Sequence, residues 1–193
     1  MSMAAHSHDK PMTLADRLAH ETGVDVFRCY QCGKCSAGCP MAAEMDYPSS
    51  VLMRMLQTGD EPSAQKAIAS HSIWLCLSCE TCFCRCPMEI DIPKVADYLR
   101  SQAVQQKKVH PAAKNIRRFH EAFLDTIHYT GRLYEVGLIA DYKTRSWNLW
   151  QDVLMAPVLF IKGKLKLWPH TVANRKAVRK LFERSRPVQE VKP

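Results

Sequence analysis

Residues 29–40 read CYQCGKCSAGCP, and residues 76–87 read CLSCETCFCRCP. The second stretch repeats the cysteine spacing of the first, with each cysteine displaced by 47 residues. Eight of the nine cysteines in the 193-residue chain form this repeat, and the ninth, Cys84, lies inside the second stretch. A Cys-x2-Cys-x2-Cys-x3-Cys-Pro run is typical of the ligands of cubane iron–sulfur clusters. The repeat therefore predicts two [4Fe-4S] clusters, whose iron and sulfide carry one-electron chemistry.

The same spacing occurs in two-cluster bacterial ferredoxins, where the fourth cysteine of each run binds the other run's cluster. This resemblance implies that cluster 1 is held by Cys29, Cys32, Cys35 and Cys86. It implies that cluster 2 is held by Cys76, Cys79, Cys82 and Cys39. Because each cluster would then join distant parts of the chain, we expect that the metal-free protein does not fold stably.

Zinc and disulfide bonds are the alternative uses of these cysteines. Structural zinc normally takes its four ligands as two separated pairs or with histidine, rather than as triplets. The first 25 residues lack the apolar core of a signal peptide. We therefore expect a cytoplasmic protein whose thiols stay reduced and available as metal ligands. We expect Cys84 to be a spare thiol that faces away from the clusters. Two alternatives stay open: Cys84 could be an alternative ligand or a redox-active thiol.

The composition divides the chain in two. Residues 1–106 carry 9 Lys/Arg against 12 Asp/Glu, and residues 107–193 carry 18 against 7, which gives net charges of −3 and +11. We therefore predict a cluster-binding domain over 1–106 and a basic helical extension over 107–193 that docks to other subunits. The basic charges are interleaved with aliphatic residues at helical spacing, which argues against nucleic acid as the partner. A solvated helix face is the alternative to a docking surface.

Helical patterns dominate the first domain, and no alternation typical of strands is present. A helix is predicted over 12–22, with Thr13 as its cap and Asp16 in the capping-box position. An Asp-x-Pro motif at 46–48, and again at 91–93, precedes two further helices, which end near Gly59 and Lys107. Another helix is predicted over 62–74, and its inward-facing residues are Ala64, Ala67, Ile68 and Trp74. The repeated cassette suggests a pseudo-twofold, all-α domain.

The extension is predicted to be helical as well. Apolar residues recur at spacings of three and four over 111–129, which indicates an amphipathic helix closed by Gly131. Further helices are predicted over 132–140 and 144–155. The apolar segment 153–161 is too short to cross a bilayer, but it and the lysines after it could lie on a membrane surface or on a partner. We expect the last residues, 185–193, to be frayed.

These features together resemble the α-helical ferredoxin family, and within it HdrC, the iron–sulfur electron-transfer protein of heterodisulfide reductase. The resemblance rests on the first helix, the two cysteine runs, the Asp-x-Pro helix starts and the GRLYE stretch at 131–135, and it covers residues 12–140. It implies an electron-transfer subunit of a larger hetero-oligomeric complex. Electrons would pass between an HdrA-like flavoprotein and a catalytic, disulfide-reducing HdrB-like protein.

We predict no catalytic residues in this chain. It lacks the Cys-Cys pair that the family's HdrB proteins carry, and it shows no triad, P-loop or dinucleotide-binding glycine motif. Two other functions stay open: the iron–sulfur subunit of a membrane-associated respiratory enzyme like succinate dehydrogenase, and a structural metal module without redox activity. Lys34 and Arg85 lie inside the runs and would favour the reduced clusters, unless both side chains point to solvent.

Overall fold

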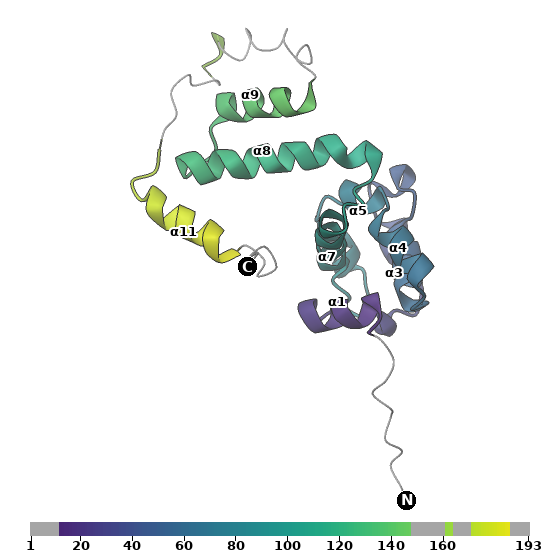
Figure 1. The fold of residues 1–193 in the computed structure, drawn as a ribbon. Coiled ribbons are helices and arrows are strands. Elements are labelled where there is room, and N and C mark those ends of the chain that lie inside the picture. Colours follow the sequence, from purple (N-terminus) through teal and green to yellow (C-terminus); the bar gives the residue numbers. More distant parts are fainter. Residues whose placement is uncertain (1–11, 148–160, 164–170, 186–193) are drawn as a thin grey trace, which may run out of the picture. The chain divides into compact units, whose positions relative to one another are not determined.

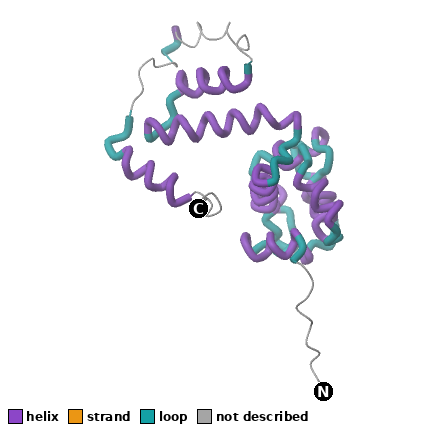
Figure 2. Tube along the Cα trace, in the orientation of Figure 1, coloured by secondary structure: helices purple, strands orange, loops and turns teal. Residues whose placement is uncertain are grey.

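The computed structural model describes residues 12–147, 161–163 and 171–185 of the chain. These residues form helices and loops and contain no strand (Figure 2), which confirms the all-α prediction. The chain divides into two compact units, residues 1–113 and residues 114–193. The functional division after residue 106, inferred above from charge, stays a prediction.

Helix α1 (Leu14–Thr22) begins with the predicted capping box. The Thr13 hydroxyl accepts a hydrogen bond from the backbone N–H of Asp16 at 3.2 Å, and the Asp16 carboxylate accepts one from the N–H of Thr13 at 2.9 Å. This pair satisfies two N–H groups that the start of a helix leaves without partners. Gly23 ends the helix with a φ of +74°, a conformation that glycine adopts without steric cost. Leu14 and Leu18 are buried, so α1 packs its apolar face onto the core.

The cysteine repeat is also a repeat of local structure. Short helices α2 (Lys34–Ala37) and α6 (Thr81–Cys84) occupy the same place in the two runs and contact each other. Two longer helices, α3 (Ser49–Gln57) and α7 (Ile92–Gln105), follow the two Asp-x-Pro motifs. Two 3₁₀ turns, η1 (Val26–Arg28) and η2 (Ala42–Glu44), flank the first run. Figure 1 shows the helices of this unit gathered around one core. The largest fully buried apolar residues there are Leu18, Met53, Leu56, Ile68, Ile73 and Leu99.

The single helix predicted over 62–74 is wrong, because the chain forms two helices there. Helix α4 (Glu61–Ile68) ends before Ser70, whose hydroxyl donates to the carbonyl of Ala67, and α5 (Ser72–Leu75) starts afresh. The cap for α5 comes from outside: the Asp46 carboxylate accepts from the N–H groups of His71 and Ser72 at 2.9 and 2.8 Å. The four residues predicted to face inward are buried, which confirms that part: Ala64, Ala67, Ile68 and Trp74.

The two Asp-x-Pro motifs therefore act differently. Asp91 caps its own helix, because its side chain accepts from the N–H of Lys94 at 3.0 Å in the first turn of α7. Asp46 does not cap α3, because it is engaged with α5; the N–H of Ser50 in the first turn of α3 instead donates to the Ser36 hydroxyl at 2.9 Å. Both predicted helices are present, but only the second motif caps its own helix.

The second unit contains helices α8 (Lys114–Thr130), α9 (Glu135–Ser146) and α11 (Arg175–Ser185), and a 3₁₀ turn, η3 (Pro111–Ala113), precedes it. Helix α8 confirms the amphipathic helix, and Gly131 follows it with a φ of +82°. The break predicted between 140 and 144 is wrong, because α9 runs through it. Arg145 on α9 binds Asp125 on α8 at 2.6 Å and Asp141 on its own helix at 2.8 Å. This contact holds α9 against α8.

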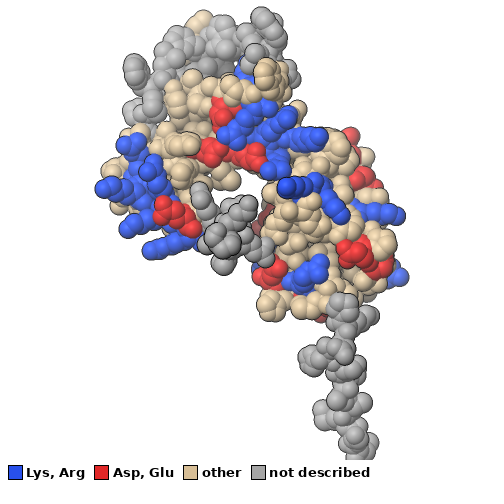
Figure 3. Space-filling view, in the orientation of Figure 1, with Lys and Arg blue, Asp and Glu red and all other residues tan. Residues whose placement is uncertain are grey.

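Helix α11 lies in the predicted basic helical extension, although no separate helix was predicted over its residues. Five of its eleven residues are Lys or Arg. Figure 3 shows these side chains gathered over α11. None of the helices that the structure describes is long and apolar enough to cross a membrane. Most of the predicted 144–155 helix and of the apolar segment 153–161, and the predicted frayed end, lie outside the described residues.

Candidate iron–sulfur sites

Cysteines from both runs line a first cavity, here called cavity 1. Three of them belong to the first run and the fourth, Cys86, closes the second run; the four are Cys29, Cys32, Cys35 and Cys86. Met53 from α3 and Ile90 from the loop before α7 supply apolar walls. Cys35 is buried and Cys32 is exposed, so the cavity reaches from the core to the surface.

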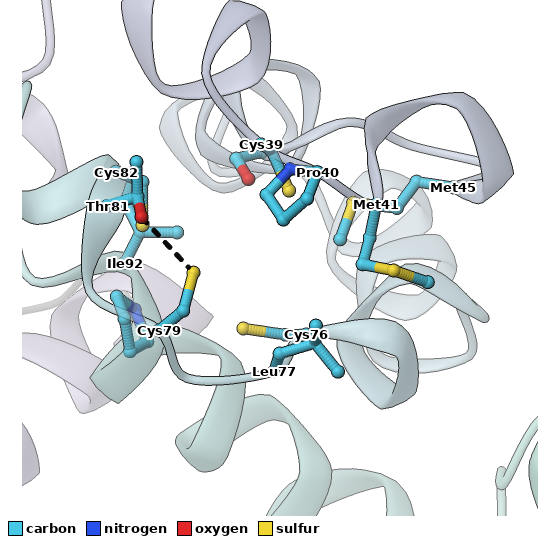
Figure 4. Close-up of a pocket in the computed structure, with 12 residues that line it drawn as sticks. Cys39, Pro40, Met41, Met45, Cys76, Leu77, Cys79, Thr81, Cys82 and Ile92 are labelled. Atoms are coloured by element: carbon cyan, nitrogen blue, oxygen red, sulfur yellow. Dashed lines mark hydrogen bonds between the residues drawn. The ribbon is translucent and has the colours of Figure 1, made fainter.

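A second cavity, cavity 2, repeats this arrangement with the roles of the runs exchanged. Its cysteines are Cys39 from the first run and Cys76, Cys79 and Cys82 from the second. Figure 4 shows the four sulfur atoms around one shared space, with Met41 and Met45 at its side. Ile92 lines both cavities, so one buried side chain forms part of the wall of each. The structure thus brings all eight predicted cysteines together in the two predicted sets of four.

The backbone of the two runs follows the same path. Gln31 and Gly33 have φ angles of +62° and +76°, and the residues at the same places in the second run, Ser78 and Glu80, have +49° and +59°. Alternation of left-handed and right-handed residues turns successive N–H groups toward one side, which forms a concave site for anionic atoms. Such a turn suits a cluster whose sulfides and thiolates carry negative charge.

Burial acts on the thiols of both cavities. Burial raises the pKa of the Cys35 thiol, and it raises the pKa of Cys82 to about 11. Cys79 is exposed, and its hydrogen bond with the Thr81 hydroxyl at 3.4 Å lowers its pKa. Because only thiolates bind metal, cluster insertion must release the protons of the buried thiols.

A cubane cluster fits this donor set better than a single ion does. Among the described residues, no three His, Cys, Asp or Glu side chains converge closely enough to hold one metal ion. The cysteine sulfurs of cavity 2 instead stand around a space that they share (Figure 4). Four thiolates around a common space are the ligand set of a [4Fe-4S] cluster.

Residues 25–90 match the family model of the 4Fe-4S dicluster domain. The matched residues, here called the dicluster domain, contain all eight cysteines of the two runs. Its cofactors are two [4Fe-4S] clusters, as the cysteine spacing predicts.

The dicluster domain has relatives among iron–sulfur subunits of heterodisulfide reductases, which confirms the resemblance to HdrC. The HdrC protein of the CoB–CoM heterodisulfide reductase of Methanopyrus kandleri is 31% identical over 51% of this chain and 50% of its own length. An HdrC protein of the Methanocaldococcus jannaschii enzyme is 33% identical over 46% of each chain. The corresponding protein of the H₂:CoB-CoM heterodisulfide,ferredoxin reductase of Methanothermobacter thermautotrophicus is 29% identical over 54% of this chain and 55% of its own. The chain spans about half the length of the curated relatives it matches.

Two side chains anchor the dicluster domain's cysteine loops, and sequence reasoning missed both. Gln57, the last residue of α3, donates from its amide nitrogen to the carbonyls of Val26 and Cys29 at 3.0 and 2.6 Å. Arg100 on α7 donates from Nε and Nη2 to the carbonyls of Ile73 and Cys76, each at 2.5 Å. No sequence signal marks these residues, because the two anchors differ in residue type and lie far from the runs.

The remaining predicted residues lie at the domain surface. Cys84 is exposed and is absent from the lining of both cavities, as expected for a spare thiol. The Arg85 side chain lies against Gly38, so closely that a Cβ on Gly38 would stand 2.1 Å from its Nη1. Gly38 and Arg85 hold the same place in the two runs, so the runs touch at equivalent positions. Lys34 is exposed and lines cavity 1.

Proposed function

We propose that this chain is an electron-transfer subunit whose clusters are each held by cysteines from both runs. Cluster 1 would lie in cavity 1 and cluster 2 in cavity 2. The observation that carries this proposal is the exchange of the fourth cysteine, since Cys86 lines cavity 1 and Cys39 lines cavity 2. Each bound cluster supplies a one-electron carrier.

The side chains of the domain serve to hold the two carriers close together and to shield them. Ile92, buried and shared by both cavity walls, keeps the two sites adjacent while excluding water between them. Apolar surroundings and anchored loops favour transfer with little rearrangement, because the ligands do not have to move when the charge of the cluster changes.

Each cavity also has one edge that a partner can reach. Cys32 and Cys79, at the same place in the two runs, are the exposed cysteines among the eight. Beside them, Tyr30 is 58% exposed and Leu77 is 65% exposed. Large apolar residues at the surface are typical of contact sites when they gather at a functional edge. Two such edges allow an electron to enter at one cluster and leave at the other.

We further infer that the partners are an HdrA-like flavoprotein and a disulfide-reducing HdrB-like protein, as in heterodisulfide reductases. The relatives that carry the HdrC name support this assignment. The basic helix α11 and the exposed residues of α8 offer the second unit as a docking surface for this complex. The proposed complex is therefore hetero-oligomeric.

Pairs of cysteine substitutions test the exchanged ligands. A chain with Cys32→Ser and Cys86→Ser loses two ligands of cluster 1 alone, so it should keep one [4Fe-4S] cluster. A chain with Cys32→Ser and Cys39→Ser loses one ligand from each site and should lose or damage both. Iron content and EPR of the reduced proteins measure the outcome, with Cys84→Ala as the control that keeps both clusters. The reverse pattern would show that each run binds its own cluster.

The relay itself is tested in the complex. A tagged chain isolated from its native host should bring down a flavoprotein and a protein with Cys-Cys-Gly signatures. The complex with Cys32→Ser and Cys86→Ser should assemble but fail to pass electrons from the flavin to the partner. Normal electron flow through a complex that lacks cluster 1 would refute the relay.

A further inference from the structure

The anchors of the two cysteine loops differ in charge although they bind equivalent atoms. Val26 and Ile73 hold the same place relative to their runs, and so do Cys29 and Cys76. The amide of Gln57 donates to the carbonyls of Val26 and Cys29 at the start of the first run. The guanidinium of Arg100 donates to the equivalent carbonyls of Ile73 and Cys76 in the second run. One loop is thus fixed by a neutral group and the other by a permanent cation.

We propose that Arg100 raises the reduction potential of cluster 2 above that of cluster 1, so that electrons pass from cluster 1 to cluster 2. This inference rests on the ligand sets of the proposed function. A cluster gains one negative charge when it is reduced, and a nearby cation stabilises that charge. Net charge, hydrogen bonds to sulfur and solvent exposure are the means by which a protein sets such potentials.

Hydrogen bonds to sulfur are present at both sites. In cavity 1 the Gln31 side-chain nitrogen lies 3.4 Å from Cys29 Sγ, and in cavity 2 the Thr81 hydroxyl lies 3.4 Å from Cys79 Sγ. The side chains of Tyr30 and Ser36 add hydrogen bonds at Cys32 and Cys35, so these neutral donors favour reduction of cluster 1 and act against the effect of Arg100. Exposure does not separate the two sites, because each cavity has one exposed cysteine, Cys32 and Cys79. The charge of the anchor is the larger difference, because a little-exposed cation interacts with an added electron more strongly than a neutral hydroxyl does.

Other charges near the sites are weaker because they are solvated. Lys34 beside cavity 1 and Glu80 beside cavity 2 oppose the effect of Arg100, but both are exposed, and water and salt screen them. The Arg100 side chain is only 18% exposed. Its own partner Asp97, bound at 2.8 Å, is 63% exposed, so it offsets the cation only in part.

The direction of flow follows from this difference. The electron leaves reduced cluster 1, which returns to its oxidised state, and reduces cluster 2, with no proton transferred and no bond broken. The donor would then meet the edge at Tyr30 and Cys32, and the acceptor the edge at Leu77 and Cys79. Flow in this direction is downhill inside the protein.

Redox titration of the full chain, followed by EPR, tests the assignment with matched variants. Arg100→Gln should reduce the equilibrium constant for reduction of cluster 2 about tenfold, which lowers the higher midpoint potential by about 59 mV for one electron. The lower midpoint potential should not change. Arg100→Lys should keep most of the potential. Gln57→Lys should raise only the lower couple, because its ammonium group can still donate to the carbonyls of Val26 and Cys29 and adds a positive charge at cluster 1.

If the Arg100→Gln chain fails to hold cluster 2, its potential cannot be measured, and Asp97→Asn then serves as an independent test. This variant leaves the hydrogen bonds of Arg100 intact and removes the negative charge that partly neutralises its guanidinium. It should therefore raise the higher midpoint potential. If Arg100→Gln moves neither potential, or moves the lower couple, or if Asp97→Asn has no effect, the inference is overturned. Two clusters that bind but cannot be reduced would instead refute the proposed function, so the two failures are distinguishable.

Discussion

Asp46 joins the first half of the dicluster domain to the second, and its removal should loosen cluster 2. Its carboxylate accepts from the hydroxyl and N–H of Ser72 at 2.5 and 2.8 Å and from the N–H of His71 at 2.9 Å. Ser72 is buried, and α5 leads directly into Cys76. The carboxylate therefore positions the start of the second cysteine run from a loop that follows the first.

The size of the effect follows from these contacts. In Asp46→Asn, one carboxylate oxygen becomes an NH₂ group, which cannot accept from the N–H of His71 or Ser72. A hydrogen bond to a charged group contributes about 1.5–3 kcal/mol, and the exposure of Asp46 places the loss near the low end, about 1.5 kcal/mol. That free energy corresponds to a change of about tenfold in the equilibrium that opens this joint.

Loss of the visible absorbance of the clusters in mild denaturant, under anaerobic conditions, measures this opening. Asp46→Asn should lose absorbance about tenfold faster than the parent when opening and reclosing are fast relative to cluster loss. Asp25→Asn is the matched control, because Asp25 accepts only from the nearby N–H of Phe27 and asparagine caps equally well. Equal rates for Asp46→Asn and Asp25→Asn would refute the role of Asp46 as a joint.

The pH dependence of the same rate has a definite sign. Burial alone would raise the pKa of Asp46, but the hydrogen bonds from Ser72, His71 and Tyr47 outweigh it and lower that pKa below its ordinary value. The stabilisation is therefore complete above the ordinary carboxyl pKa of about 4 and is lost as the pH falls through the lowered pKa. The difference between the parent and Asp46→Asn should shrink only in that acid range.

Four further predictions follow from other parts of the molecule. Glu80 has a left-handed φ of +59°, so Glu80→Gly should stabilise the domain by about 1 kcal/mol, whereas Gly33→Ala, at +76°, should destabilise it by a similar amount in thermal melts. The metal-free protein should lose its native far-UV circular dichroism and its cooperative melt, and a native-like spectrum would contradict this. Cys84→Ala should leave iron content unchanged, since a lower content would make Cys84 a ligand. Arg145→Ala should weaken the packing of α9 on α8 by about 1 kcal/mol of free energy and so speed hydrogen exchange in α9. The cluster content should not change.

The sequence predicted best those features that depend on local pattern. The capping box at Thr13 and the start of α7 at Asp91 follow from short-range hydrogen bonding, and both are present. The cysteine spacing predicted two clusters, because the turns between ligands leave few other arrangements. The pattern did not predict the partners of Asp46, which matches Asp91 in its motif but binds residues 25 and 26 positions further along the chain. A contact between distant residues leaves no periodic trace.

The same limit explains why the anchors could not be predicted. Gln57 and Arg100 occupy different turns of α3 and α7, so no repeat of spacing connects them. Only the folded chain shows that both reach equivalent pairs of carbonyls. Helix α11 does carry an amphipathic pattern, since Val178, Leu181 and Phe182 recur at helical spacing, but no separate helix was predicted there.

The differences inside the repeat carry as much information as the repeat itself. Equal cysteine spacing gives two similar sites, and two clusters of equal potential would give no preferred direction of transfer. The non-cysteine positions break this equality: Gly38 faces Arg85, and Gln57 is matched by Arg100. Arg85 can lie across position 38 only because glycine has no side chain there. The two runs therefore contact each other at a position where their residues differ. A duplicated cassette thus provides the two cysteine sets, and the proposed effect of Arg100 would give the pair an order.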